Sequence, residues 1–233
     1  MNATRAPVAE VRVVALVPAR DEADRVGATV RALRSIAHVT EVVVVDDGST
    51  DGTASEALAA GAGVLRLSRT AGKGRALEGA LRRLPEPDVW LLADADLGAT
   101  AGNLARVLEP VLGGRADLAI ATFPPGQGGG FGIVKRFAGW SIGLVCGFVP
   151  AEPLSGQRAA TGATIAACRP LARGFGVETA MTIDAVRAGL RVLEVPAALE
   201  HRPTGRDARG FAHRGRQGLD IVFAVLARGL GLR

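Results

Sequence analysis

Short apolar runs of strand length alternate with amphipathic stretches of helical length through the first half of this chain. The runs cover residues 11–17, 41–45, 64–67, 89–93 and 118–121. A continuous apolar run of this length is typical of a strand that is buried on both faces of a sheet. The order strand, helix, strand predicts an α/β fold with a mostly parallel central sheet, right-handed crossovers and helices on both faces. Functional loops are then expected at the carboxyl ends of the strands.

The second half of the chain predicts further elements and one long loop. Helices are expected over residues 133–147, 178–188 and 211–233, and strands over residues 162–169 and 191–195. The proline and glycine cluster at residues 123–132 predicts either a mobile loop over a site or a plain surface linker. With 233 residues, the chain is long enough for one domain with a substantial core.

The composition excludes a disordered chain, because 48% of the residues are hydrophobic and 22% are charged. No uninterrupted run of about 18 apolar residues predicts a membrane span, and the first residues lack the pattern of a secretory signal. Cys146 and Cys168 fit no metal or redox spacing, so we expect two reduced thiols. Together these features predict a cytoplasmic protein.

The net charge of +5 is concentrated near the end of the chain. Residues 201–233 contain seven arginines and two aspartates, a surplus that equals the net charge of the whole chain. Such a segment favours an anionic partner, which is a phosphorylated substrate, the inner face of a membrane or a nucleic acid. Nucleic acid is disfavoured because the segment has no aromatic interleaving and no nucleic-acid motif. The alternatives are a solvated basic helix face and a helix that packs on its own domain.

Two aspartates follow the predicted strand at residues 89–93, in the sequence WLLADADL. Asp94 and Asp96 therefore lie where a buried strand ends and a loop begins. Hard divalent cations bind through one or two carboxylates together with substrate phosphates, so this pair suits a cation that carries a diphosphate. Strand-end aspartates also form turns and cap helices, and that alternative stays open for the pair on its own.

Three other segments place polar residues at strand ends or at a helix start. They are VPARDEADRV at residues 17–26, VVVVDDGSTDGT at 42–53 and AGKGRALEGAL at 71–81. The Gly-Lys-Gly of the third segment precedes a helix N-terminus, where backbone amides favour a phosphate or a sugar hydroxyl. A P-loop is excluded, because Leu67 stands where its first glycine is required and a glycine follows Lys73.

Taken together, these segments resemble the nucleotide-binding half of family 2 glycosyltransferases, which have the Rossmann-like GT-A fold. The segments SGQRA at residues 155–159 and VETAMTIDAVRAGLRVLEVP at 177–196 resemble the acceptor half of that family, in the same order. The resemblance is strongest to the branch with polyprenyl-phosphate sugar synthases and glucosyl-phosphoglycerate synthases. It implies a single GT-A domain over residues 1–233, divided into a nucleotide-sugar-binding half (10–121), an acceptor half (122–210) and a basic amphipathic helix (211–233).

The resemblance implies a UDP- or GDP-sugar donor and Mg²⁺ or Mn²⁺ as the cofactor. The residues that it assigns to the nucleoside side of the donor are Pro18, Ala19, Arg20, Glu22, Asp46 and Asp47. Lys73 would face the diphosphate or ribose, Asp94 the ribose or metal, and Asp96 the metal, where it would act in catalysis. His201 resembles a histidine that completes the metal coordination in some relatives, and a bystander role is its alternative.

The acceptor side is assigned through Glu178, which occupies the place of the family's general base. The usual Glu-Asp pair is missing, since Val177 precedes Glu178 and Thr179 follows it. Glu178 could therefore act as a base for a hydroxyl, orient an already ionised phosphate, or cap its helix. Residues that could hold acceptor or donor phosphates are Arg158, Lys135, Arg136, Arg202 and Arg206, with surface solubility as the alternative for each.

The sequence therefore predicts a metal-dependent, inverting glycosyltransferase with an unidentified acceptor. A polyprenyl phosphate or another phosphorylated or envelope-related molecule is one class of acceptor. TFPPG at residues 122–126 disfavours the polyprenyl assignment, since many polyprenyl-phosphate enzymes carry an arginine there. A sugar-phosphate nucleotidyltransferase is one alternative. It would need a glycine-rich, basic loop directly after the first strand, which VPARDEADRV at residues 17–26 lacks. A catalytically silent donor-binding scaffold module is the other alternative. The basic C-terminal segment predicts peripheral contact with the inner face of the membrane.

Overall fold

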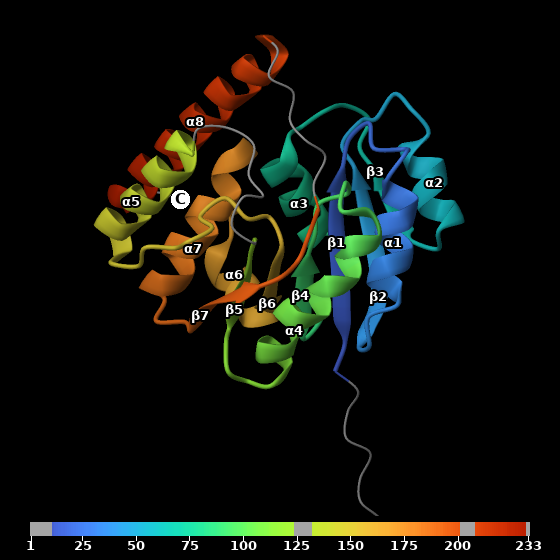
Figure 1. The fold of residues 1–233 in the computed structure, drawn as a ribbon, viewed down its shortest axis with the longest axis horizontal. Helices are drawn as coiled ribbons and strands as arrows, with labels where there is room; N and C mark the ends of the chain where they lie inside the picture. The colour runs from blue at the N-terminus through green and yellow to red at the C-terminus, as the bar shows by residue number, and fades with distance from the viewer. Residues whose placement is uncertain (1–10, 124–131, 201–207, 232–233) are drawn as a thin grey trace, which may run out of the picture.

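A computed structural model describes residues 11–123, 132–200 and 208–231 (Figure 1). Its described strands form one sheet in the order β3-β2-β1-β4-β6-β5-β7. The strands are β1 (Val13–Ala19), β2 (Val39–Asp46), β3 (Gly63–Arg66), β4 (Val89–Leu92), β5 (Leu118–Thr122), β6 (Arg158–Thr161) and β7 (Val192–Pro196). β6 is antiparallel to its neighbours β4 and β5, and the other pairs are parallel. The predicted mostly parallel α/β fold is confirmed.

Helices connect these strands and cover the sheet. They are α1 (Val26–Arg34), α2 (Thr53–Ala59), α3 (Lys73–Leu81), α4 (Ala105–Leu112), α5 (Ile133–Cys146), α6 (Gly162–Cys168), α7 (Val177–Arg187) and α8 (Ala208–Gly229), with the 3₁₀ turns η1 (Gly98–Leu104) and η2 (Gly174–Gly176). None of the helices in the described ranges is long and apolar enough to cross a bilayer. The predicted segment at residues 123–132 lies almost entirely outside the described residues.

The sheet separates two hydrophobic clusters, one on each face. Along β1, Val13, Ala15 and Val17 belong to the cluster covered by α1, α2 and α4. Val14 and Leu16 point to the other face, which α3, α6 and α7 cover. The continuous apolar run of β1 thus buries both sets, and each fully buried valine or leucine contributes about 1.5–3 kcal/mol. This central strand carries the first site loop at its carboxyl end.

The prediction of a strand over residues 162–169 is wrong, because those residues form α6. The strand lies just before it, as β6, and its pairing with β4 ends at Thr161. The Thr161 hydroxyl then accepts a hydrogen bond from the Thr164 amide at 3.1 Å and caps α6. A short apolar run has the same pattern in a buried helix as in a buried strand, so periodicity could not separate the two.

The C-terminal helix α8 packs on the domain. Ile221 and Ala224 are buried, and Arg228 forms an ion pair with Asp184 of α7 at 2.8 Å, with both side chains almost fully buried. Arg187 of α7 donates hydrogen bonds to backbone carbonyl oxygens of both α8 and α5. Residues 218–231 therefore pack on their own domain, as one of the two alternatives to an anionic partner predicted, and do not form only a solvated basic face.

Candidate active site

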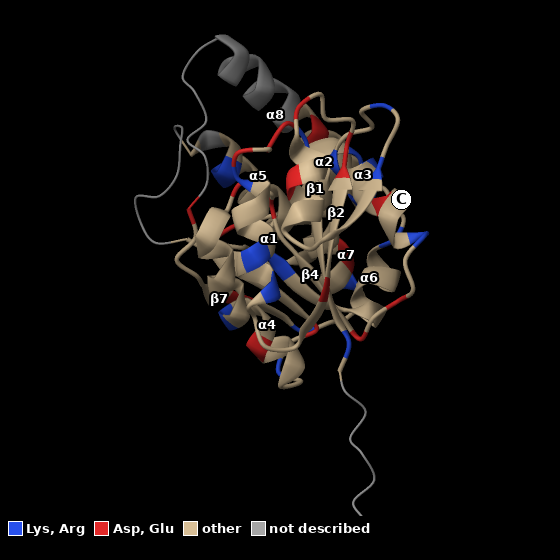
Figure 2. Cartoon of the chain, turned by 90° about the vertical axis from the view of Figure 1, so that its right-hand side faces the viewer, with Lys and Arg blue, Asp and Glu red and all other residues tan. Residues whose placement is uncertain are grey.

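The loops after β1 and β2 are joined into one rim at the carboxyl end of the sheet. Asp21 adopts a left-handed backbone conformation with φ of 53°, which aspartate tolerates better than most residues. Its carboxylate accepts a hydrogen bond from the Thr50 amide at 2.8 Å, and its own amide donates to the Ser49 hydroxyl at 3.0 Å. The Glu22 amide donates to the Thr53 hydroxyl at 2.8 Å. Acidic residues gather in these loops, as Figure 2 shows.

Asp47 connects this rim to the Gly-Lys-Gly segment. Its carboxylate accepts hydrogen bonds from the amides of Ala71 at 2.6 Å and Gly72 at 2.9 Å. Gly72 has a φ of 87°, which a residue with a side chain rarely adopts, and this turn starts α3 at Lys73. The glycine therefore lets the chain turn so that Lys73 enters the cleft from the first turn of a helix.

Asp46, the neighbour of Asp47, has a different position. Its side chain is fully buried, accepts a hydrogen bond from the Ser49 amide at 2.8 Å and pairs with Arg66 at 3.2 Å. Of the two aspartates, only Asp47 lines the cleft. The structure thus places Asp46 at the end of β2, where its carboxylate holds the turn that follows, and not on the cleft wall where donor contact was predicted.

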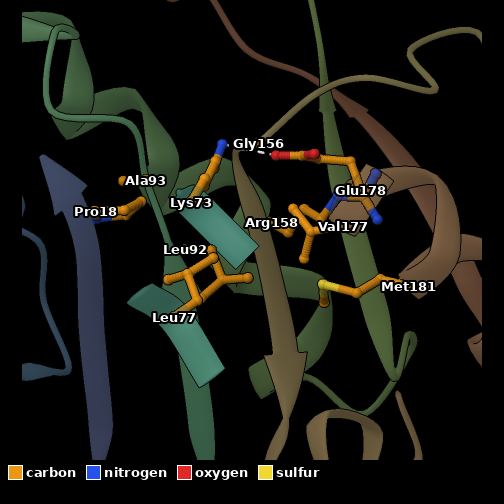
Figure 3. Close-up of a pocket in the computed structure, with 10 residues that line it drawn as sticks. All are labelled: Pro18, Lys73, Leu77, Leu92, Ala93, Gly156, Arg158, Val177, Glu178 and Met181. Carbon is orange, nitrogen blue, oxygen red and sulfur yellow. Dashed lines mark ion pairs between the residues drawn. The ribbon is translucent and has the colours of Figure 1, made fainter. Parts of the chain in front are cut away.

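The Lys73 ammonium joins the two halves of the domain. Its Nζ lies 2.7 Å from Asp94 Oδ1 and 2.7 Å from Glu178 Oε1. Figure 3 shows the ion pair between Lys73 and Glu178. Gln157 Nε2 donates a hydrogen bond to the other oxygen of Asp94 at 2.6 Å. Burial disfavours the charged ammonium, but the two carboxylates outweigh burial and raise the pKa of Lys73. Lys73 is therefore a fixed positive charge between the strand-end aspartate and the acceptor-half glutamate.

Gly156 leaves the room that this network occupies. A Cβ atom at this position would lie 2.5 Å from Lys73 Nζ and 2.9 Å from Asp94 Oδ1. These separations are shorter than any van der Waals contact, so a side chain here would displace the ammonium or the carboxylate. The backbone at the start of β6 thus forms part of the site itself.

Arg158 lies below the floor of the cleft. Its side chain has no exposed surface, and it donates hydrogen bonds to the Ser155 carbonyl at 2.8 Å and the Thr182 hydroxyl at 3.0 Å. Its Nη2 has no hydrogen-bond partner among the described residues. Burial lowers the pKa of Arg158 to about 10, and the charge of Glu178 opposes that shift. Arg158 lines the small buried pocket that Figure 3 shows, together with Lys73 and Glu178, but it does not line the larger cleft.

The cleft has a volume of about 790 Å³. Seven of the residues predicted for the donor side line it: Pro18, Ala19, Arg20, Glu22, Asp47, Lys73 and Asp94. An adjoining cavity of about 330 Å³ shares several of these residues and adds Asp96 and Glu178. The structure therefore brings together the donor-side, metal and acceptor carboxylates that were predicted from three separate segments.

Asp94 and Asp96 fit a divalent cation that is also held by phosphates of a ligand. Both line the same cavity, although Asp94 already contacts Lys73 and Gln157 through its two oxygens. No cluster of three or more His, Cys, Asp or Glu side chains suited to a metal occurs within the described ranges. Two carboxylates completed by phosphate oxygens are a usual arrangement for Mg²⁺. The predicted third ligand, His201, lies outside the described residues.

Two of the predicted phosphate-binding residues, Lys135 and Arg136, do not lie in this cleft. They lie in the first turn of α5 and line a separate groove, where Lys135 pairs with Glu152 at 2.6 Å. Both side chains are exposed. Arg202 and Arg206 lie outside the described residues.

The sequence analysis missed Gly156, Gln157 and a contribution from α8. The first two stand directly before Arg158 in the motif SGQRA, so the motif was visible but their roles were not. From α8, Asp220 lines the cleft and accepts a hydrogen bond from the Phe175 amide at 3.1 Å. No local pattern marks Asp220, because it is one polar residue in an amphipathic helix. The C-terminal helix therefore forms part of the cleft wall.

The chain is similar to proteins of known activity along most of its length. It is 29% identical over 196 residues to the glycosyltransferase AglJ of Haloferax volcanii. This match covers 82% of this chain and 64% of that protein. It is 29% identical over 240 residues to an undecaprenyl-phosphate mannosyltransferase of Micrococcus luteus, which covers 96% of this chain and 98% of that protein.

The fold is also similar to that of a solved enzyme. The glucosyl-3-phosphoglycerate synthase of Mycobacterium tuberculosis, in complex with Mn²⁺, UDP and glucosyl-3-phosphoglycerate, superposes with a TM-score of 0.81 and 25% identity. The match covers 97% of this chain and 82% of that chain. The GT-A architecture that the motifs implied is thereby confirmed.

A family model covers more than half of the chain. Residues 14–148 match the family described as Glycosyl transferase family 2, and this range contains the loops after β1, β2 and β4 that line the cleft and the adjoining cavity. The resemblance inferred from the strand-end motifs is confirmed: the chain belongs to glycosyl transferase family 2.

Proposed function

We propose that the chain is an inverting, metal-dependent glycosyltransferase that moves a sugar from a nucleoside diphosphate sugar to an acceptor that carries a phosphate. The observation that carries the proposal is the Lys73 ammonium, which lies 2.7 Å from both Asp94 and Glu178. One positive charge thus stands between the donor-side loops and the acceptor half. Two relatives support the acceptor class, since one name gives undecaprenyl phosphate and one complex contains a phosphoglycerate.

The metal in this proposal is Mg²⁺ or Mn²⁺, held by Asp96 and Asp94 together with the donor diphosphate. Solved relatives with Mn²⁺ and UDP, or with Mg²⁺ and UDP, support this choice. When bound, the cation supplies Lewis-acid neutralisation of the charge that grows on the leaving diphosphate. Asp96 is proposed for direct contact with the cation, because the family resemblance gives it that role and it lines the same cavity as Asp94. Both oxygens of Asp94 accept hydrogen bonds, one from Lys73 and one from Gln157.

The residues of the chain perform the remaining tasks. Lys73 binds the diphosphate, and its shift toward the phosphates frees Glu178 to face the acceptor. An acceptor oxygen attacks the anomeric carbon as the bond from that carbon to the diphosphate breaks, which inverts the configuration. A hydroxyl acceptor passes its proton to Glu178, whereas a phosphate acceptor is already ionised and needs only orientation. Arg158, buried beneath Glu178, keeps a positive charge close to that carboxylate.

We also infer that the protein is cytoplasmic and contacts the inner face of the membrane peripherally, in a step of cell-envelope synthesis. The charge surplus of residues 201–233 supports this inference, because basic segments are attracted to the anionic lipids of that face. A membrane-linked phosphate acceptor would be presented at the same surface.

A donor panel tests the proposed reaction. We expect one sugar nucleotide among UDP-glucose, GDP-mannose and related donors to raise the melting temperature in the presence of Mn²⁺, because a ligand that binds only the native state stabilises it. The same donor should then be consumed when 3-phosphoglycerate or a polyprenyl phosphate is added, with nucleoside diphosphate as the product. Binding without turnover of any donor would instead indicate a silent donor-binding module. Absence of any thermal shift would refute donor binding altogether.

Replacing Gly156 by alanine is expected to weaken binding of UDP in the presence of Mn²⁺ by about tenfold or more, because small displacements of positioned groups are costly. The added methyl group would displace Lys73 Nζ and the Asp94 carboxylate, which are the ends of side chains and can move without disturbing the core. The melting temperature should therefore change little. Isothermal titration calorimetry with UDP measures the effect.

Gly79→Ala is the matched control for this variant. Gly79 lies in α3, and a Cβ atom there would meet no atom within 4 Å, so alanine should keep the UDP affinity and slightly favour the helix. Wild-type UDP affinity in Gly156→Ala would show that the Lys73 network does not position the donor site.

A further inference from the structure

Two helices at one end of the molecule expose apolar side chains. On α5 these are Trp140 and Leu144, and on α8 and the turn that follows it they are Leu219, Phe223, Leu226 and Leu230, each 56–75% exposed. We call this surface the α5–α8 face. The α8 positions recur at steps of four, three and four residues, which places them on one side of the helix. The other side packs on the domain through Ile221, Ala224 and Arg228.

The two helices of the α5–α8 face are in contact. Arg187 of α7 lies at their junction and donates hydrogen bonds to the carbonyl oxygens of Val145 in α5 and Arg228 in α8. Figure 1 shows both helices at the end of the molecule opposite α1 and α2. Large apolar side chains exposed on neighbouring helices are typical of an interaction surface.

The charge on these helices selects the partner. α5 contains Lys135, Arg136 and no acidic residue, and residues 208–218 of α8 contain three arginines and no acidic residue. Asp220 is the single acidic residue of α8, and it is turned toward Phe175 at the cleft. Exposed aromatic and aliphatic side chains on helices with a basic sequence match the interface of an anionic bilayer, where apolar groups enter the acyl boundary and cations meet the headgroups.

A second copy of this chain fits the same surface poorly. A twofold symmetric contact places the same patch of both copies together, so two helices with the same basic sequence would be brought close to each other. No helix within the described ranges could cross the bilayer, so contact would lie in the plane of the interface. We propose that the α5–α8 face docks the protein on an anionic membrane, with Trp140 and Phe223 inserted at the interface.

This inference deepens the proposed membrane contact and rests on it, but it moves the contact from the basic segment alone to a face built by two helices. It also sets the orientation of the domain. α8 supplies Asp220 to the cleft from one side and exposes its apolar stripe on another, so docking would hold the cleft mouth at a fixed distance from the headgroups.

Tryptophan fluorescence provides the first test, with the full chain. The chain has two tryptophans, of which Trp90 is 2% exposed and Trp140 is 59% exposed, so the solvent-sensitive signal comes from Trp140. We expect a blue shift when vesicles of phosphatidylglycerol and phosphatidylcholine are added. The shift should be absent with pure phosphatidylcholine, diminish with added salt, and disappear in Trp140→Phe. No shift with anionic vesicles would overturn the proposal.

Vesicle flotation with variants provides the second test. The double variant Trp140→Ser/Phe223→Ser should lower partitioning onto the anionic vesicles by about tenfold or more, since both inserted side chains are lost. Leu58→Ser on α2 is the matched control, because Leu58 is 58% exposed at the opposite end of the molecule. Equal losses in both variants would refute a specific face.

Two further measurements separate this proposal from its alternatives. If sedimentation shows a dimer that the double variant dissolves, and vesicles do not bind, the face is a contact between copies and the proposal is wrong. Donor turnover measured without vesicles should be the same in the double variant and the native chain. If the native chain turns over no donor at all, the proposed reaction is contradicted, whereas the flotation result stays valid.

Discussion

Asp96→Ala is expected to lower metal-dependent donor turnover by about a hundredfold to a thousandfold, the usual effect of removing one group that stabilises developing charge. Asp96 lines the cavity that also contains Asp94 and Glu178, and it is the carboxylate proposed for direct contact with the cation. Its side chain is partly exposed at a strand end, so the free energy of unfolding should change little. Initial rates measured across a Mn²⁺ titration provide the test.

Glu109→Ala serves as the control for this variant. Glu109 lies on α4 in an exposed ion pair with Arg115, so its loss removes the same charge away from the cleft and should leave turnover unchanged. Native rates and a native Mn²⁺ dependence in Asp96→Ala would eliminate the proposed metal site.

Lys73→Met is expected to produce the second large loss, with turnover reduced about a hundredfold or more. The substitution removes the charge proposed to bind the diphosphate and leaves Asp94 and Glu178 facing each other without their shared cation. Because Glu178 is almost fully buried, the variant should also lose about 2 kcal/mol of stability, discounted for the 20% exposure of Lys73. Chemical denaturation and steady-state kinetics measure the two effects.

The double variant Lys73→Met/Glu178→Gln separates catalysis from stability. Removing both charges should restore part of the lost stability, because an unpaired buried group costs more than a missing pair. Turnover should stay low. Arg82→Met, at the exposed end of the same helix, is the charge-matched control and should retain both properties. Near-native turnover in Lys73→Met would contradict the role given to this residue.

The fold could be predicted wherever a strand is buried on both faces. β1, β2, β4 and β5 were predicted within two residues at every end, because continuous apolar runs bounded by polar loops have few other solutions. β7 was predicted within one residue at each end, although it is an edge strand that is only partly buried. The prediction of a strand over residues 162–169 was wrong, since a short apolar run suits a strand and a helix equally. The tertiary pairing of β6 with β4, which ends at Thr161, decides where the strand stops.

The site could be predicted in part for a similar reason. Parallel strands end at one edge of the sheet, so Asp47, Lys73 and Asp94 had to converge, and the family resemblance added Glu178. The positions of Gln157 and Arg158 depend on the reversed direction of β6. Adjacent residues there point to opposite sides, so one bonds Asp94 and the other lies buried beneath Glu178. A sequence motif records both residues but not the direction of the strand.

The position of β6 between β4 and β5 has a consequence for synthesis on the ribosome. β4 and β5 do not pair with each other, so each leaves a hydrogen-bonding edge open until a strand from much later in the chain has been translated. The open edge of β4 carries Trp90, Leu91 and Leu92, and exposed apolar edges of this kind promote aggregation. Residues 158–161 therefore close the sheet, and Gly156 and Gln157 directly before them contact the Lys73–Asp94 network, so the same segment that protects the nascent chain completes the candidate site.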